Sequence, residues 1–193
     1  MRRTASLAIG VLALGALAGS AGAVNASEPI ERFTAFAVDL GGPTNRARTG
    51  TVDIAIERWS TDAERDQLVA ALKEGGPDAL LRSLRKIKHE AGYIRGGTSL
   101  GYPLRFARQL EGSDGQRRII IATDRPISFL EARRAGRSLD YPFMLIELRL
   151  NAEGKGEGKL LPVAKVTANS DHVVEIENFA QEPVRLTEVH KES

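Results

Sequence analysis

Hydrophobic and polar residues alternate most regularly along residues 51–57. Val52, Ile54 and Ile56 occupy every second position there, and the positions between them are polar or small. Successive side chains of a strand point to opposite faces of a sheet, so this alternation predicts a strand with one buried and one solvated face. We expect Val52, Ile54 and Ile56 to face the core.

The hydrophobic period becomes helical after Thr61. Thr61 and Glu64 fit a capping box, in which each side chain satisfies a free backbone N–H at the start of a helix. We expect this helix to end at Gly75 and Gly76, and Pro77 suits the first turn of a second helix that extends to residue 87. The pattern therefore predicts an αα-hairpin that packs on a sheet.

Most of the chain after residue 92 predicts strands joined by short connections, apart from a helix of about two turns over residues 128–136. Such short loops allow only antiparallel neighbours. Within residues 30–40, Phe36, Val38 and Leu40 share one face of the expected strand, and Ala35 and Ala37 share the other. The expected strands cover residues 30–40, 51–57, 93–95, 104–111, 117–123, 141–150, 159–167, 172–178 and 184–189.

These elements predict a single α+β domain over residues 27–193. Its main part is an antiparallel β-meander of about eight or nine strands, which carries the packed αα-hairpin. A sheet of that length tends to curl, so we expect either a barrel or a two-layer sandwich. Asp114 and Gly115 predict a two-residue turn, which would place Glu111 opposite Arg118 and bring Arg105 and Arg118 to one face of the sheet.

Four short motifs lie in the last third of the chain: Gly154-Lys-Gly-Glu-Gly-Lys159, Val163-Ala-Lys165, Glu175-Ile-Glu-Asn178 and Pro183-Val-Arg-Leu186. In these motifs the chain resembles a group of uncharacterised secreted bacterial proteins. The group has no assigned activity, so the resemblance implies no reaction, cofactor or site residue for this chain.

The first residues have the pattern of a cleaved secretory signal peptide. Arg2 and Arg3 precede an apolar run over residues 5–18, and small residues follow up to Ala23 and Ala26. Glycines interrupt the run, which is shorter than the roughly 20 apolar residues that a membrane span needs. We expect a signal peptide at residues 1–26, cleavage after Ala23 or Ala26, and a secreted or periplasmic protein with no membrane anchor after cleavage.

Composition changes the interpretation of the charge. The chain of 193 residues has 27 Lys and Arg against 25 Asp and Glu, but the signal peptide contains Arg2 and Arg3 and no acidic residue. The mature chain then has 25 charges of each sign, so we expect no nucleic-acid partner. The chain has no cysteine and three histidines, so we also expect no metal site and no cofactor. A protein partner and a small ligand both stay open.

Arginines are concentrated between residues 105 and 137, where eight of them accompany four acidic residues, whereas acids outnumber bases by six to two over residues 171–193. Two interpretations stay open. The first is a solvated face that balances the acidic region, which predicts no saturable polyanion binding at about 0.15 M ionic strength. The second is a site for an anion or an acidic partner, centred on Arg105 and Arg118.

Residues 97–101 match the G-x-S-x-G motif of α/β-hydrolases, with Ser99 as the nucleophile. That motif works on a sharp turn from a strand into a helix, and here Tyr102 and Pro103 lead into another strand. The sequence therefore favours a secreted or periplasmic, non-catalytic binding or interaction module. The alternatives are a serine hydrolase that uses Ser99 and an apolar-ligand-binding β-barrel.

Overall fold

The computed structural model of the chain describes residues 28–39, 48–97, 101–112, 116–125, 143–162, 165–168, 174–177 and 184–192. The predicted signal peptide, the Asp114–Gly115 turn, the helix at 128–136 and Ser99 lie outside these residues. Within them the elements are β1 (Glu31–Asp39), β2 (Arg48–Ile56), α1 (Asp62–Lys86), β3 (Gly92–Gly96), β4 (Tyr102–Glu111), β5 (Arg117–Thr123), β6 (Met144–Leu150), β7 (Lys155–Pro162), β8 (Lys165–Ala168), β9 (Val174–Glu177) and β10 (Val184–Lys191).

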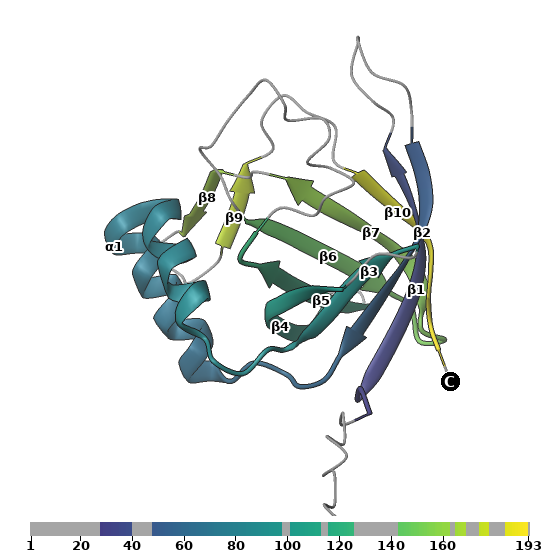
Figure 1. The fold of residues 1–193 in the computed structure, drawn as a ribbon, viewed down its shortest axis with the longest axis horizontal. Coiled ribbons are helices and arrows are strands. Elements are labelled where there is room, and N and C mark those ends of the chain that lie inside the picture. Colours follow the sequence, from purple (N-terminus) through teal and green to yellow (C-terminus); the bar gives the residue numbers. More distant parts are fainter. Residues whose placement is uncertain are drawn as a thin grey trace, which may run out of the picture.

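Eight strands close into an antiparallel barrel in the order β1-β10-β7-β6-β5-β4-β3-β2 (Figure 1). β8 and β9, which follow β7 in the sequence, pair with each other in a separate two-stranded sheet. The expected antiparallel α+β fold is confirmed, and of the two expected architectures the barrel is the one that forms. Because β1 pairs with β10, each barrel strand has a neighbour on both sides.

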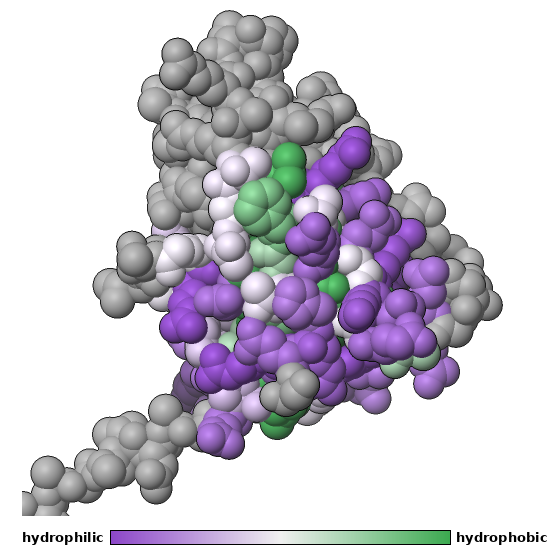
Figure 2. Space-filling model, turned by 90° about the vertical axis from the view of Figure 1, so that its right-hand side faces the viewer, coloured by the Kyte–Doolittle hydropathy of each residue, from purple (hydrophilic) through white to green (hydrophobic). Residues whose placement is uncertain are grey.

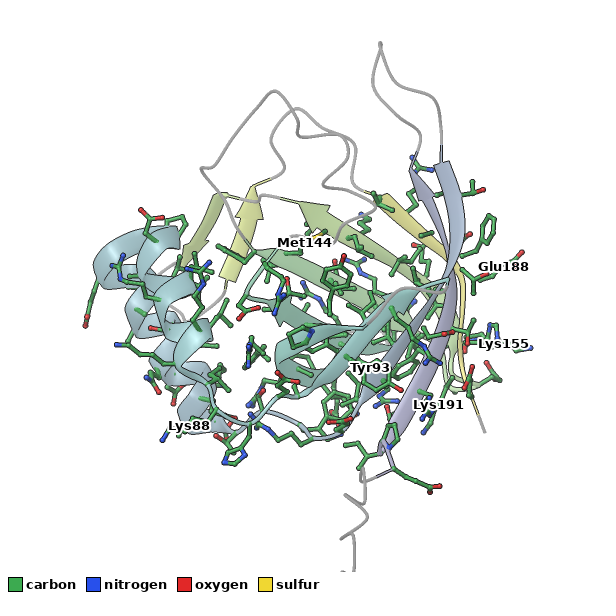
Figure 3. All side chains as sticks on the ribbon, viewed as in Figure 1. Lys88, Tyr93, Met144, Lys155, Glu188 and Lys191 are labelled. Carbon is green, nitrogen blue, oxygen red and sulfur yellow. The ribbon has the colours of Figure 1, made fainter. Side chains whose placement is uncertain are left out.

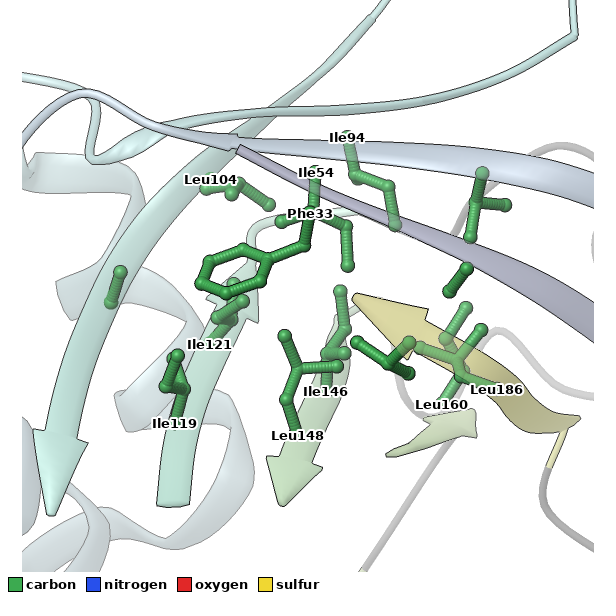
Figure 4. Close-up of a cluster of buried hydrophobic side chains, with 14 of the residues drawn as sticks. Phe33, Ile54, Ile94, Leu104, Ile119, Ile121, Ile146, Leu148, Leu160 and Leu186 are labelled. Atoms are coloured by element: carbon green, nitrogen blue, oxygen red, sulfur yellow. The ribbon is translucent and has the colours of Figure 1, made fainter. Parts of the chain in front are cut away.

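Apolar side chains fill the inside of the barrel (Figure 4). Val52, Ile54 and Ile56 face inward and are at most 2% exposed, as their alternation predicts. Ile54 lies between Phe33 of β1 and Ile94 of β3 in the register of the sheet. Every barrel strand contributes at least one buried apolar side chain to this cluster, so the main core of the domain is the barrel interior.

α1 packs against the outside of the barrel and forms a second core there. Its expected capping box is present: the N–H of Glu64 donates to Thr61 Oγ1 (3.2 Å), and the N–H of Thr61 donates to Glu64 Oε2 (2.8 Å). Leucines of the helix cover apolar side chains that β4, β5, β6 and β7 direct outward. The second core contains Leu68, Leu72, Leu80, Leu81 and Leu84 from α1, together with Phe106, Ala122, Phe143, Leu145 and Leu161.

The prediction of an αα-hairpin is wrong, because the segment forms one helical element with a kink. Only Gly75 (φ −140°, ψ 15°) and Gly76 (φ 65°, ψ −161°) leave helical geometry, so no separate loop forms between two helices. Arg58 donates both to Glu64 in the first turn (2.9 Å) and to the carbonyl of His89 beyond the last turn (3.1 Å). A straight helix of this length would span roughly 37 Å, so the kink is sharp enough to keep both ends of α1 near Arg58.

The pairing of β4 with β5 differs by one residue from the predicted register. Glu111 lies opposite Arg117, and Leu110 lies opposite Arg118. A shift of one residue moves a strand's side chains to the other face relative to its partner. A further irregularity between Leu104 and Phe106 interrupts the pairing. The predicted pair of Glu111 with Arg118 is therefore corrected, and Arg118 shares its outward face with Leu110.

Candidate functional site

Arg105, one of the two arginines predicted to form a site, ties separate elements of the fold together. Its Nε donates to Asp124 Oδ2 (2.9 Å) at the end of β5, and its Nη1 lies 3.3 Å from Glu90 Oε1, in the segment between α1 and β3. The side chain is only 17% exposed. Since its charge is already balanced by two carboxylates, Arg105 is placed to hold the fold together.

Arg118, the second predicted arginine, belongs to a different cluster on the outer face of β5 and β6. Its Nε donates to Glu147 Oε1 (2.6 Å), and Nε of Arg149 donates to the same oxygen (3.0 Å). Glu147 has a side chain that is 10% exposed. Arg118 and Arg149 lie directly opposite each other, and the shared carboxylate offsets their mutual repulsion. Arg105 and Arg118 thus have different carboxylate partners and do not form one cluster.

The outer surface of β1, β10 and β7 combines two cations with apolar side chains. Val38 lies opposite Arg185, and Arg185 lies opposite Lys159. Both cations are exposed, and within the described part of the chain neither has an ion-pair partner. Phe36, on the same outward face as Val38, is 39% exposed. We call Phe36, Val38, Lys159 and Arg185 the outer patch. Figure 2 shows this side of the molecule, where a small hydrophobic area has hydrophilic side chains on its right and near-neutral residues on its left.

Inward-facing charged side chains close the end of the barrel at which β1 begins. Arg117 Nη2 donates to Glu31 Oε2 (2.6 Å), and Lys191 Nζ donates to Glu31 Oε1 (3.1 Å). The Arg117 guanidinium carbon lies 6.0 Å from the ring centre of Phe33 and 5.6 Å from that of Trp59. Figure 3 shows Lys191 near the C-terminal end of the described chain. These groups separate the apolar interior from solvent, and the buried Nε of Arg117 has no hydrogen-bond partner among the described residues.

Arg58 supplies the main electrostatic effect at the start of α1. Hydrogen bonds from its guanidinium to Glu64 (2.8 and 2.9 Å) hold the pKa of that carboxyl below its ordinary value of 4.5, against the opposing effect of burial. Bonds from Thr61 lower the pKa further. The arrangement stabilises the helix start and contains no group that is free to react.

The described residues offer few other groups for chemistry. His89 and His190 are exposed, and Nδ1 of His190 contacts the carbonyl of Glu188 (2.9 Å). Within these residues no three His, Cys, Asp or Glu side chains come together as possible metal ligands. No helix in the same part of the chain is both long and apolar enough to span a membrane. Ser99, the candidate nucleophile, lies outside the described residues.

Sequence reasoning placed Phe36 and Val38 on one face but did not place Lys159 and Arg185 beside them. β7 and β10 are neighbours in the barrel although β8 and β9 lie between them in the sequence. Local periodicity carries no information about such a pairing. Barrel closure could have predicted it, because the consecutive pairs from β1 to β7 leave β1 and β7 as free edges, and β10 pairs with both.

Comparison of the chain with protein-family models, with curated proteins and with solved structures found no match in any of the three. The resemblance of its C-terminal motifs to secreted bacterial proteins stays a prediction. Function is therefore inferred from the geometry of the described residues.

Proposed function

We propose that the chain is a secreted or periplasmic, non-catalytic binding module, whose barrel is a rigid scaffold and whose partner binds on the outer surface. The packing of the barrel interior is the observation that carries this proposal. Phe33, Ile54, Ile94, Ile121 and Leu148 are among the inward side chains that are less than 2% exposed. Side chains so completely excluded from solvent indicate that the protein's own atoms pack the space between them.

The same packing speaks against an apolar ligand inside the barrel. A ligand of useful size needs a cavity of about 300 Å³ or more. Entry would require side chains such as Ile121 and Leu148 to leave their packed positions, which costs the contacts that stabilise the fold. The charged group around Glu31 and Arg117 also obstructs one end of the barrel. Binding on the outer surface carries neither cost.

The position of β1 is compatible with the proposed export. β1 begins at Glu31, a few residues after the expected cleavage sites at Ala23 and Ala26. Removal of the signal peptide therefore leaves every strand of the barrel complete. The mature domain also keeps Glu31 and Arg32, which contact Lys191 and Tyr93 respectively.

Two measurements on the mature protein test this function. Native mass spectrometry should give the mass of the polypeptide alone, and a fluorophosphonate probe should label neither the wild type nor the Ser99→Ala variant. A small apolar molecule bound in stoichiometric amount would place the ligand in the barrel and overturn the proposal. Stoichiometric labelling that disappears in the Ser99→Ala variant would overturn it in favour of a serine hydrolase.

A further inference from the structure

We infer that the outer patch is the docking site for an acidic polypeptide segment that also carries aromatic or aliphatic side chains. This inference rests on the proposed function, because it assigns a partner class and a surface to the binding module. The patch spans three neighbouring strands of the closed sheet, from Phe36 and Val38 of β1 to Arg185 of β10 and Lys159 of β7.

The first observation is the direct pairing of two like charges. Lys159 and Arg185 are cross-strand partners, and like charges in such pairs repel each other. On its other side Lys159 lies opposite Glu147 of β6, but the hydrogen bonds to that carboxylate come from Arg118 and Arg149. Arg118 and Arg149 are also cross-strand partners, but Glu147 bridges them through one carboxylate oxygen. Within the described residues no carboxylate lies within ion-pair distance of Lys159 or Arg185. A carboxylate from a partner could satisfy both cations at once.

The second observation is the orientation of β1. Its small side chains, Ala35 and Ala37, face the barrel interior, whereas Phe36 and Val38 face outward and Phe36 is 39% exposed. Full burial of the Phe36 side chain would contribute about 1.5–3 kcal/mol to the stability of the fold. The outward orientation gives up part of that contribution. Aromatic side chains and arginine are enriched at protein interfaces, and the patch contains both in Phe36 and Arg185.

The third observation is the position of the patch on the barrel. α1 covers outward-facing side chains of β4 to β7, including Phe106 and Leu161, whereas Phe36 of β1 has no part in that cluster. Figure 2 shows the side that carries β1 and β10, with its hydrophobic area exposed. A partner that supplies carboxylates and apolar side chains matches both components of this surface, whereas a polyanionic glycan would match only the charges.

The test measures binding of fluorescent polymers to the mature protein at about 0.15 M ionic strength. A glutamate-rich random copolymer with tyrosine should bind saturably. Polyglutamate of the same length should bind at least about fivefold more weakly, because exposed charges are screened at this salt concentration and it lacks side chains for Phe36. Heparin serves as the glycan probe and should also bind more weakly than the copolymer.

Substitutions identify the surface. Lys159→Glu with Arg185→Glu should weaken copolymer binding by about tenfold or more, since two attractions become repulsions. Phe36→Ser should remove the preference for the copolymer over polyglutamate. Lys73→Glu with Lys88→Glu makes the same charge change on and just after α1, and it should leave binding unchanged. Thermal unfolding of each variant checks that the fold persists, which is expected because the replaced side chains are exposed.

Several results would overturn the inference. These are the absence of saturable copolymer binding, an equal loss in the Lys73/Lys88 variant, and tighter binding of heparin than of the copolymer. Concentration-dependent dimer formation through Phe36, seen by sedimentation, would reassign the patch to a second copy of the chain. Failure of the proposed function can be told apart from failure of this inference. The first would appear as a bound small molecule or as labelling of Ser99, and neither result depends on the polymer-binding measurements.

Discussion

Ile54 occupies the middle of the barrel interior, where it is 1% exposed and lies in register between Phe33 and Ile94. Its replacement by alanine removes three carbon atoms from a site that is closed to solvent. The neighbouring strands are hydrogen-bonded on both sides, so they have little freedom to move into the space. The cost of such a substitution therefore includes both the lost burial and the cavity left behind.

We predict that Ile54→Ala lowers the free energy of unfolding by about 2–5 kcal/mol, measured by urea denaturation. The control is Ile30→Ala, because Ile30 is 51% exposed and the same change should cost less than about 0.5 kcal/mol. If the two variants lose similar amounts of unfolding free energy, the contribution of Ile54 to stability does not come mainly from its packing inside the barrel.

Glu64 gives a prediction about pH. Its pKa is lowered in the folded state, first by the hydrogen bonds from Arg58, so the folded state favours the charged carboxylate. That contribution to stability is complete above the ordinary pKa of 4.5 and is lost as the pH falls through the lower folded-state value.

Wild type should therefore be more stable than Glu64→Gln at pH 7, and the difference should shrink as the pH falls below about 4.5. Urea denaturation at several pH values measures the difference. The pH-dependent part should be absent when the same comparison is made in an Arg58→Gln background. A constant difference from pH 7 to pH 3 would contradict the assignment.

Single residues also show where sequence reasoning succeeds and where it stops. Val52, Ile54 and Ile56 could be assigned to the core because their face carries all the large apolar residues of the strand, although Ala55 on the other face is also buried. Both faces of β1 carry apolar residues, so alternation alone could not show that Ala35 faces inward and Phe36 outward. Periodicity separates two faces, but only packing against other strands decides which face is buried.

At the scale of elements, β7 approaches β6 unusually closely at Gly156. A Cβ atom added there would lie 1.8 Å from the carbonyl oxygen of Arg149, whereas a Cβ at Gly50 of β2 would meet nothing within 4 Å. The backbone oxygen of a paired strand cannot move away without breaking the ladder. This close approach explains why glycine occupies the position.

We predict that Gly156→Ala destabilises the protein by about 3 kcal/mol or more, through strand displacement or loss of pairing. Gly50→Ala should change stability by no more than about 0.5 kcal/mol. Thermal unfolding compares the two variants, and circular dichroism checks that strand content is kept. If both substitutions are tolerated equally, the packing of β6 on β7 is looser than described.

Element types could be predicted better than their pairing. The capping box at Thr61 marked the start of α1, and the glycines at 75 and 76 marked its kink. The sequence did not show that two residues with non-helical backbone angles produce a kink within one helical element and not a loop between two helices. The register of β4 and β5 was also missed by one residue, because hairpin register depends on loop length and on irregularities such as the one between Leu104 and Phe106.

At the scale of the whole molecule, the strand count allowed a barrel or a sandwich, and pairing of β1 with β10 selects the barrel. That pairing joins strands from the two ends of the domain, so no local sequence pattern predicts it. The candidate site shows the same limit, because Arg105 and Arg118 were grouped by the hairpin register predicted from the Asp114–Gly115 turn, which is one residue off. The fold instead gives them different carboxylate partners and brings Lys159 beside Arg185.

Export gives the prediction for the whole chain. When the full-length chain is expressed in a bacterial host, its stable form should be found in the periplasm or medium, with cleavage after Ala23 or Ala26. Intact-mass measurement identifies the new N-terminus. An Arg2→Asn, Arg3→Asn variant should be exported less efficiently, since the positive segment before the apolar run is part of the signal. Stable cytosolic protein that still contains Arg2 would contradict the prediction.

Closure of the barrel by β1 and β10 also has a consequence for folding. Thr187 donates to the carbonyl of Phe36 across 151 residues of sequence, so this seam has the highest contact order of the sheet, and its formation is expected to be slow. Until Val184–Lys191 is in place, β1 and β7 are both free edges that can pair with another chain. A fragment that ends before β10 should therefore aggregate through two open strands instead of remaining a soluble, partly folded barrel.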